Sequence, residues 1–164
     1  DKPVIYILGN HEFYGKTYPK HIYQLKQLAE NTNIHVLEKD VITVDGVNFL
    51  GTTLWTDFEI LGDPRIAGYE CQQVMTDYKK IRKLPGYSKI RSLDTAIYHK
   101  DSKIWLQNGL ERLKGQKNVV ITHHGPSIHQ AVRSPAFFGL TPLLPRALGR
   151  QRPRRLFFCW CDGP

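Results

Sequence analysis

The feature that most constrains this chain is a short apolar run that ends in a cluster of polar side chains. Residues 4–8 read Val-Ile-Tyr-Ile-Leu, a pattern typical of a buried strand. Gly9 follows, and glycine lets a strand break because it adopts backbone angles that other residues resist. The sequence therefore predicts that Asn10, His11 and Glu12 are presented at a strand end, where an amide, an imidazole and a carboxylate can each do chemistry.

A second apolar run ends in the same way. Residues 118–122 read Asn-Val-Val-Ile-Thr and lead directly into His123 and His124. Strand ends that carry polar side chains can converge on one rim of a sheet, which is where sites form in sheets flanked by helices. We therefore expect Asn10 and His123 to face one cleft. For any single Asn or His in a turn, local hydrogen bonding is the commoner explanation. The prediction of a site therefore depends on the two polar strand ends taken together.

The rest of the sequence predicts a mixed α/β fold. Apolar stripes at helical spacing predict helices over residues 18–31 and 94–114. Residues 59–92 are interpreted as turns and mixed structure, with 75–81 as a short helical or extended piece. Strands are predicted at residues 34–37, 41–44 and 47–50, and a two-residue turn at Asp45-Gly46 joins the last two into a hairpin.

The composition is that of an ordinary folded domain. The chain has 164 residues, of which 41% are hydrophobic and 23% charged. No apolar run approaches the roughly 20 residues that a membrane helix needs, and no signal-peptide pattern opens the sequence. The three cysteines have neither zinc-ligand nor disulfide spacing. These features predict a cytoplasmic protein with no membrane partner.

The net charge of +8 comes mostly from the end of the sequence. Residues 133–164 hold six Arg and one Asp, a charge of +5, which leaves 8 − 5 = +3 for residues 1–132. All 13 Lys lie at or before Lys117, and five of the ten Pro lie in the last 32 residues. We interpret residues 133–164 as an Arg/Pro-rich tail that is disordered or read out of frame. A nucleic-acid-binding module acting through this tail is the alternative function.

The two strand ends together resemble the calcineurin-like metallophosphoesterases. That family carries a Gly-Asn-His-(Asp/Glu) block after a strand, as at residues 9–12, and a later Val-Val-Ile-Thr-His-His-x-Pro pattern, as at residues 119–126. Residues 51–56, Gly-Thr-Thr-Leu-Trp-Thr, also look like a family strand. The resemblance spans about residues 3–129.

The resemblance implies a fold, a reaction and a role for each site residue. The fold would be a layered β-sandwich flanked by helices. The reaction would be hydrolysis of a phosphomonoester or phosphodiester by two divalent ions, Mn, Fe or Zn. Asn10 and His123 would be metal ligands, and His11 would be the catalytic group that meets the phosphate. Glu12 and His124 would line the pocket or support the ligands from behind.

Other blocks of the family pattern do not occur in this sequence. They are an Asp-x-His, a Gly-Asp block with a further Asp or Asn, and a closing Gly-His-x-His. We therefore expect residues 1–132 to be the central part of a metallophosphoesterase domain, with an incomplete fold. Because the bridging carboxylate and several His ligands are missing, we also expect the chain to be inactive alone. An inactive fragment that merely retains the middle of the fold is the remaining alternative.

Overall fold

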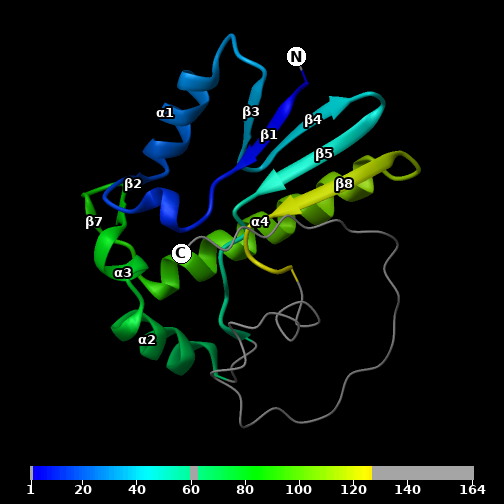
Figure 1. Cartoon of the computed structure of the whole chain (residues 1–164). Helices are drawn as coiled ribbons and strands as arrows, with labels where there is room; N and C mark the ends of the chain where they lie inside the picture. The colour runs from blue at the N-terminus through cyan, green and yellow to red at the C-terminus, as the bar shows by residue number, and fades with distance from the viewer. Residues whose placement is uncertain (1, 60–62, 127–164) are drawn as a thin grey trace.

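The structure is a computed structural model that describes residues 2–59 and 63–126 (Figure 1). The predicted tail at 133–164 lies outside these residues, so its interpretation stays a prediction. Among the described residues, no helix is long and apolar enough to cross a membrane. The elements in chain order are β1 (Val4–Ile7), η1 (His11–Phe13), β2 (Thr17–Tyr18), α1 (Lys20–Ala29), β3 (Ile34–Leu37), β4 (Asp40–Val44), β5 (Val47–Thr52), α2 (Pro64–Val74), α3 (Asp77–Lys80), β6 (Arg82–Lys83), β7 (Ser88–Lys89), α4 (Ser92–Arg112) and β8 (Lys117–Thr122).

The described strands form three small sheets, and the predicted α/β class is confirmed. β1 pairs in parallel with β3, and β4-β5-β8 form a second sheet in which β5 is antiparallel to β4 and parallel to β8. The short strands β2, β6 and β7 form the third sheet. Figure 1 shows α1 beside β3 and α4 running behind β5 and β8. The two strands that end in polar residues, β1 and β8, therefore belong to different sheets.

Most predicted elements are present with small shifts at their ends. The predicted helices at 18–31 and 94–114 correspond to α1 and α4, and the predicted strands to β3, β4 and β5. The hairpin turn is also present, since Asp45 and Gly46 have φ of 49° and 72°, the positive values that this type of two-residue turn requires.

Two predictions about local structure are wrong. The region 59–92, for which the sequence predicts turns and mixed structure, contains an 11-residue helix, α2. Its start has a clear signal, because the Asp63 side chain accepts a hydrogen bond from the Arg65 N–H at 2.9 Å and Pro64 is the first helical residue. The strand β1 is not fully buried, since its residues alternate between exposed and half-buried and Val4 is 47% exposed.

The core consists of two clusters of buried side chains. The larger cluster packs α1, α2 and the aromatic residues that follow β1, with the rings of Phe13 and Trp55 5.6 Å apart. The smaller cluster packs α4 on β5 and β8. The buried members of the larger cluster are Leu8, Phe13, Tyr18, Ile22, Val36, Trp55, Phe58, Ala67, Tyr78, Ile81 and Ile90. Those of the smaller cluster are Leu50, Leu54, Leu106 and Val120.

Thr53, which follows β5 directly, joins the two main sheets. Its hydroxyl lies 2.8 Å from the carbonyl oxygen of Leu8, at the end of β1, and 2.6 Å from a carboxylate oxygen of Glu38. Its carbonyl accepts from the backbone N–H of His124, just after β8, at 3.2 Å. Thr53 is fully buried, as is Leu8. This one residue therefore fixes where the ends of β1 and β8 lie relative to each other.

We expect Thr53→Val to destabilise the chain by about 1–3 kcal/mol, because it keeps the shape but leaves buried oxygens without their donor. Chemical denaturation measures the free energy of unfolding. The matched control is Thr122→Val, since the buried Thr122 hydroxyl has no hydrogen-bond partner in the described part of the chain. A loss equal to that of the control would show that the Thr53 hydroxyl does not hold the junction.

Candidate functional site

The structure brings Asn10 and His123 together, as the sequence predicts. His123 Nε2 donates a hydrogen bond to Asn10 Oδ1 at 3.1 Å, although the two residues are 113 positions apart in the chain. The prediction that both strand ends lie on the rim of a single sheet is wrong. β1 and β8 lie in different sheets and meet where those sheets join. The meeting point depends on Thr53, which contacts both strand ends.

The spacing of these two atoms suits two ligands of one metal ion. Ligand atoms about 2.0–2.2 Å from an ion, at tetrahedral to octahedral angles, lie about 2.8–3.6 Å from each other. The observed 3.1 Å falls in that range, and a neutral amide oxygen and an imidazole suit Mn, Fe or Zn. The described residues contain no group of three or more His, Cys, Asp or Glu that could hold an ion. Within the described residues, Asn10 and His123 are therefore a candidate pair of ligands and not a complete metal centre.

A glycine is needed at position 9 because it has no side chain, and not because of its backbone angles. Four described glycines have positive φ, and Gly9 is not among them. A Cβ at Gly9 would instead lie 2.4 Å from His123 Cε1 and 2.6 Å from His123 Nε2. The expectation that Gly9 serves to break the strand through unusual angles is therefore wrong. Its missing side chain makes room for the His123 imidazole.

The short helix η1 carries His11 and Glu12 on the exposed side of the turn. The His11 ring lies against the Tyr14 ring, with centroids 4.7 Å apart, and His11 is exposed. Glu12 points back into its own turn, where its Oε2 accepts from the Gly9 N–H at 2.6 Å. His11 is thus available to a molecule in solvent, whereas the Glu12 carboxylate holds the turn that carries Asn10.

His124 is held away from the Asn10–His123 pair. Its Nδ1 donates to the Thr53 carbonyl at 3.1 Å, and its ring stacks on Trp55 at 5.8 Å between centroids. Burial lowers the pKa of His124 to about 4, with a further contribution from the adjacent His123. Burial also lowers the pKa of His123, against the opposing charge of Glu12. Both imidazoles are therefore neutral near pH 7, which is the form that binds metals.

Asp77, the first residue of α3, is a site residue that the sequence did not reveal. Its Oδ1 accepts from Asn10 Nδ2 at 2.8 Å, and the residue is only 4% exposed. Asp77 lies in the stretch 75–81, for which the sequence predicts only a short helical or extended piece. In the sequence, one aspartate in a polar stretch looks like any acidic residue of the surface. Only the fold shows that its partner is Asn10.

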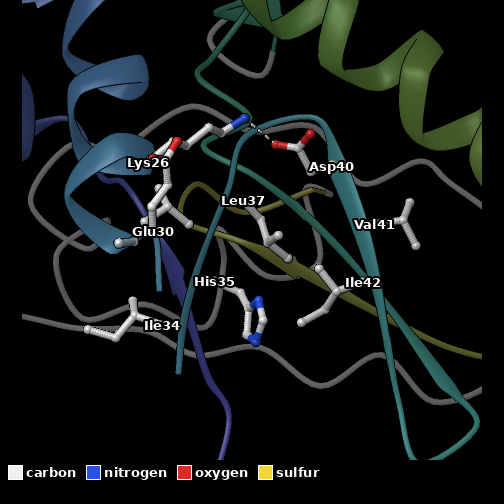
Figure 2. Close-up of a pocket in the computed structure, with 10 residues that line it drawn as sticks. Lys26, Glu30, Ile34, His35, Leu37, Asp40, Val41 and Ile42 are labelled. Atoms are coloured by element: carbon white, nitrogen blue, oxygen red, sulfur yellow. Dashed lines mark hydrogen bonds and ion pairs between the residues drawn. The ribbon is translucent and has the colours of Figure 1, made fainter. Parts of the chain in front are cut away.

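A hollow of about 320 Å³ lies elsewhere, between α1, β3 and β4 (Figure 2). Apolar side chains including Leu37 and Ile42 line it, and the Lys26 ammonium meets the Asp40 carboxylate at 2.5 Å beside it. None of the predicted site residues lines this hollow. The candidate site is therefore defined by the contact of Asn10 with His123 and not by this hollow.

We expect Gly9→Ala to cost about 1–3 kcal/mol of stability, because the added methyl group overlaps the His123 ring. A double-mutant cycle with His123→Ala tests the cause by chemical denaturation. In the His123→Ala background the space is free, so the same Gly9→Ala change should cost well under about 1 kcal/mol. Equal costs in both backgrounds would contradict the proposed steric conflict.

Comparison with known proteins agrees with the resemblance seen in the sequence. The uncharacterized protein L509 of Acanthamoeba polyphaga mimivirus is 26% identical over 131 residues, which make up 75% of this chain and 45% of that protein. The chain thus spans less than half the length of this curated relative. No solved structure gives a significant match.

The family assignment rests on a match that covers most of the chain. The sequence profile of the calcineurin-like phosphoesterases matches residues 1–147, which include both polar strand ends. Phosphoester hydrolysis and binding of divalent metal ions are general properties of this family. The chain belongs to the calcineurin-like phosphoesterase family.

Proposed function

We propose that the protein containing this segment hydrolyses phosphomonoesters or phosphodiesters at a centre of two divalent metal ions. The observation that carries the proposal is the 3.1 Å contact between Asn10 Oδ1 and His123 Nε2. Two neutral ligand atoms from strand ends 113 residues apart meet at a spacing that suits one shared ion. Membership of the calcineurin-like phosphoesterase family supports the reaction class.

In this proposal Asn10 and His123 bind one of the ions through Oδ1 and Nε2. When bound, the ions neutralise phosphate oxygens and lower the pKa of a water that attacks phosphorus. His123 suits this role because burial lowers its pKa and keeps the imidazole neutral. Gly9 leaves the space that the His123 ring occupies.

His11 acts on the substrate rather than on the metal. It follows Asn10 directly but is exposed, so its imidazole can reach a phosphate group in solvent. An imidazole beside the leaving oxygen donates a hydrogen bond or a proton as the ester bond breaks. Glu12 supports the turn through the Gly9 N–H, and His124 supports the end of β8 through the Thr53 carbonyl.

The described residues alone do not complete the proposed centre. Two dications held close together need an anionic bridge, because their repulsion is strong in a partly buried site. The described residues include Asp77 near Asn10, but no group of three or more ligating side chains. We therefore propose that the described residues bind one ion, loosely, and that turnover needs further ligands that they do not supply. A cytoplasmic location, and nucleic acid only as a substrate, stay predictions.

In a protein that contains the whole domain, we expect His11→Ala to lower kcat by about 10²–10⁴-fold with little loss of metal. Asn10→Ala and His123→Ala should lower both turnover and metal content, because each removes a ligand. Metal analysis of the three purified variants, alongside steady-state kinetics, separates the roles. Metal loss in His11→Ala alone, with the other two variants fully loaded, would reverse the assignment.

For residues 1–164 alone, we expect no measurable metal-dependent hydrolysis of an aryl phosphate or an aryl phosphodiester with added Mn²⁺. The His11→Ala chain, prepared in the same way, is the control for background hydrolysis. Turnover that requires Mn²⁺ and disappears in this control would show that the segment builds a working centre by itself.

A further inference from the structure

The carboxylate of Asp77 holds the side chain of Asn10 from the side opposite His123. Asp77 Oδ1 accepts from Asn10 Nδ2 at 2.8 Å, and Asn10 Oδ1 lies 3.1 Å from His123 Nε2. Burial, followed by the nearby Asp77 charge, raises the pKa of Tyr14 to about 12. The Tyr14 phenol therefore stays protonated near pH 7. The Asn10 amide is the side chain of this turn whose hydrogen bond to the buried Asp77 carboxylate the structure shows.

This arrangement fixes which end of the Asn10 amide faces His123. The Asp77 Oδ1 atom accepts the hydrogen bond, so the amide nitrogen of Asn10 faces Asp77. The amide oxygen, the only end that can bind a cation, then faces His123. Without an acceptor at position 77, the amide could turn over and present its NH₂ group toward the same point.

We propose that Asp77 is a positioning residue for metal binding, which orients the Asn10 amide so that Oδ1 faces the ion. The proposal rests on the proposed role of Asn10 and His123 as ligands. Groups that hold a metal ligand from behind fix the orientation in which it faces the ion. The cost of losing such a group is about 10–100-fold in metal affinity.

A purely structural role for Asp77 is the competing explanation, and the fold allows it to be tested separately. The turn is also joined to α3 and β6 by backbone hydrogen bonds, from the Gly15 N–H to the Lys80 carbonyl at 3.2 Å and from the Arg82 N–H to the Lys16 carbonyl at 3.0 Å. These bonds do not involve the Asp77 side chain. Changing that side chain should therefore leave the turn attached.

The test is a Co²⁺ titration of residues 1–164, followed by NMR, which detects weak binding. Asp77→Leu keeps the branched shape at Cγ but removes the acceptor, and should weaken Co²⁺ binding by about tenfold or more. Asp77→Asn can still accept from Asn10 Nδ2, and Tyr14→Phe leaves the amide contact intact. Both should stay within about threefold of the unmodified chain, since neither removes the acceptor.

A second readout needs no metal. In the unmodified chain the Asn10 side-chain NH₂ resonances should show a hydrogen-bonded proton, and Asp77→Asn should retain it. Asp77→Leu should lose it while circular dichroism shows the fold intact. If Asp77→Leu does not fold, Asp77→Ala serves instead, because water can fill the space that it leaves.

The outcomes separate this inference from the proposed function. Binding that Asn10→Ala weakens but Asp77→Leu does not would overturn the positioning role alone. Equal losses in Asp77→Asn and Asp77→Leu would assign the effect to charge and not to amide orientation, and would also overturn it. An unmodified chain that binds no Co²⁺, or one that Asn10→Ala leaves unaffected, would overturn the ligand assignment and this inference together.

Discussion

The site depends on the hydrogen bonds that Thr53 makes at the junction of two sheets. Its hydroxyl lies against the Leu8 carbonyl and the Glu38 carboxylate, and its carbonyl accepts from His124. Burying hydroxyl, carbonyl and carboxylate groups without hydrogen-bond partners costs free energy, so few other arrangements of the junction are stable. Because the polar residues follow directly after β1 and β8, their relative position is set there.

Around this junction, Asn10 and His123 are each held in place by contacts with different residues. Asn10 is oriented by Asp77, and its turn by the bond from the Gly9 N–H to Glu12. His123 lies against the bare face of Gly9. The site is thus held by short contacts between segments that are distant in the chain, rather than by one rigid element. Preorganisation of this kind is what ligand geometry requires.

The sequence predicts the parts of this site that are encoded locally. Apolar runs followed by Asn10 and His123 identify two strand ends, and Asp45-Gly46 identifies the hairpin. The partners could not be predicted, because one buried aspartate or threonine looks in sequence like a residue of the surface. Asp77 and Thr53 become recognisable only when the fold brings them to Asn10 and Leu8.

Two further differences have physical causes. The helix α2 was missed because Asp63-Pro64 also signals a turn, and its apolar residues stand among polar ones with Ile66 exposed. The role of Gly9 was misjudged because a close approach by a side chain 114 positions away, His123, leaves no local trace in the sequence. The first error comes from an ambiguous local signal, and the second from a tertiary contact that local patterns do not record.

The span of the Asn10–His123 contact has a consequence for folding. The pair closes a loop of 113 residues, and the Asn10–Asp77 contact closes one of 67 within it. Neither can form until most of the chain has reached its place, so the site assembles among the last features of the fold. An ion held by both strand ends would act as a cross-link, which in the chain-entropy account is worth about 4–5 kcal/mol for a loop of roughly 100 residues. Such an ion would stabilise the tertiary structure as well as take part in the reaction. Its loss would lower the free energy of unfolding, because the ends of β1 and β8 would no longer be cross-linked.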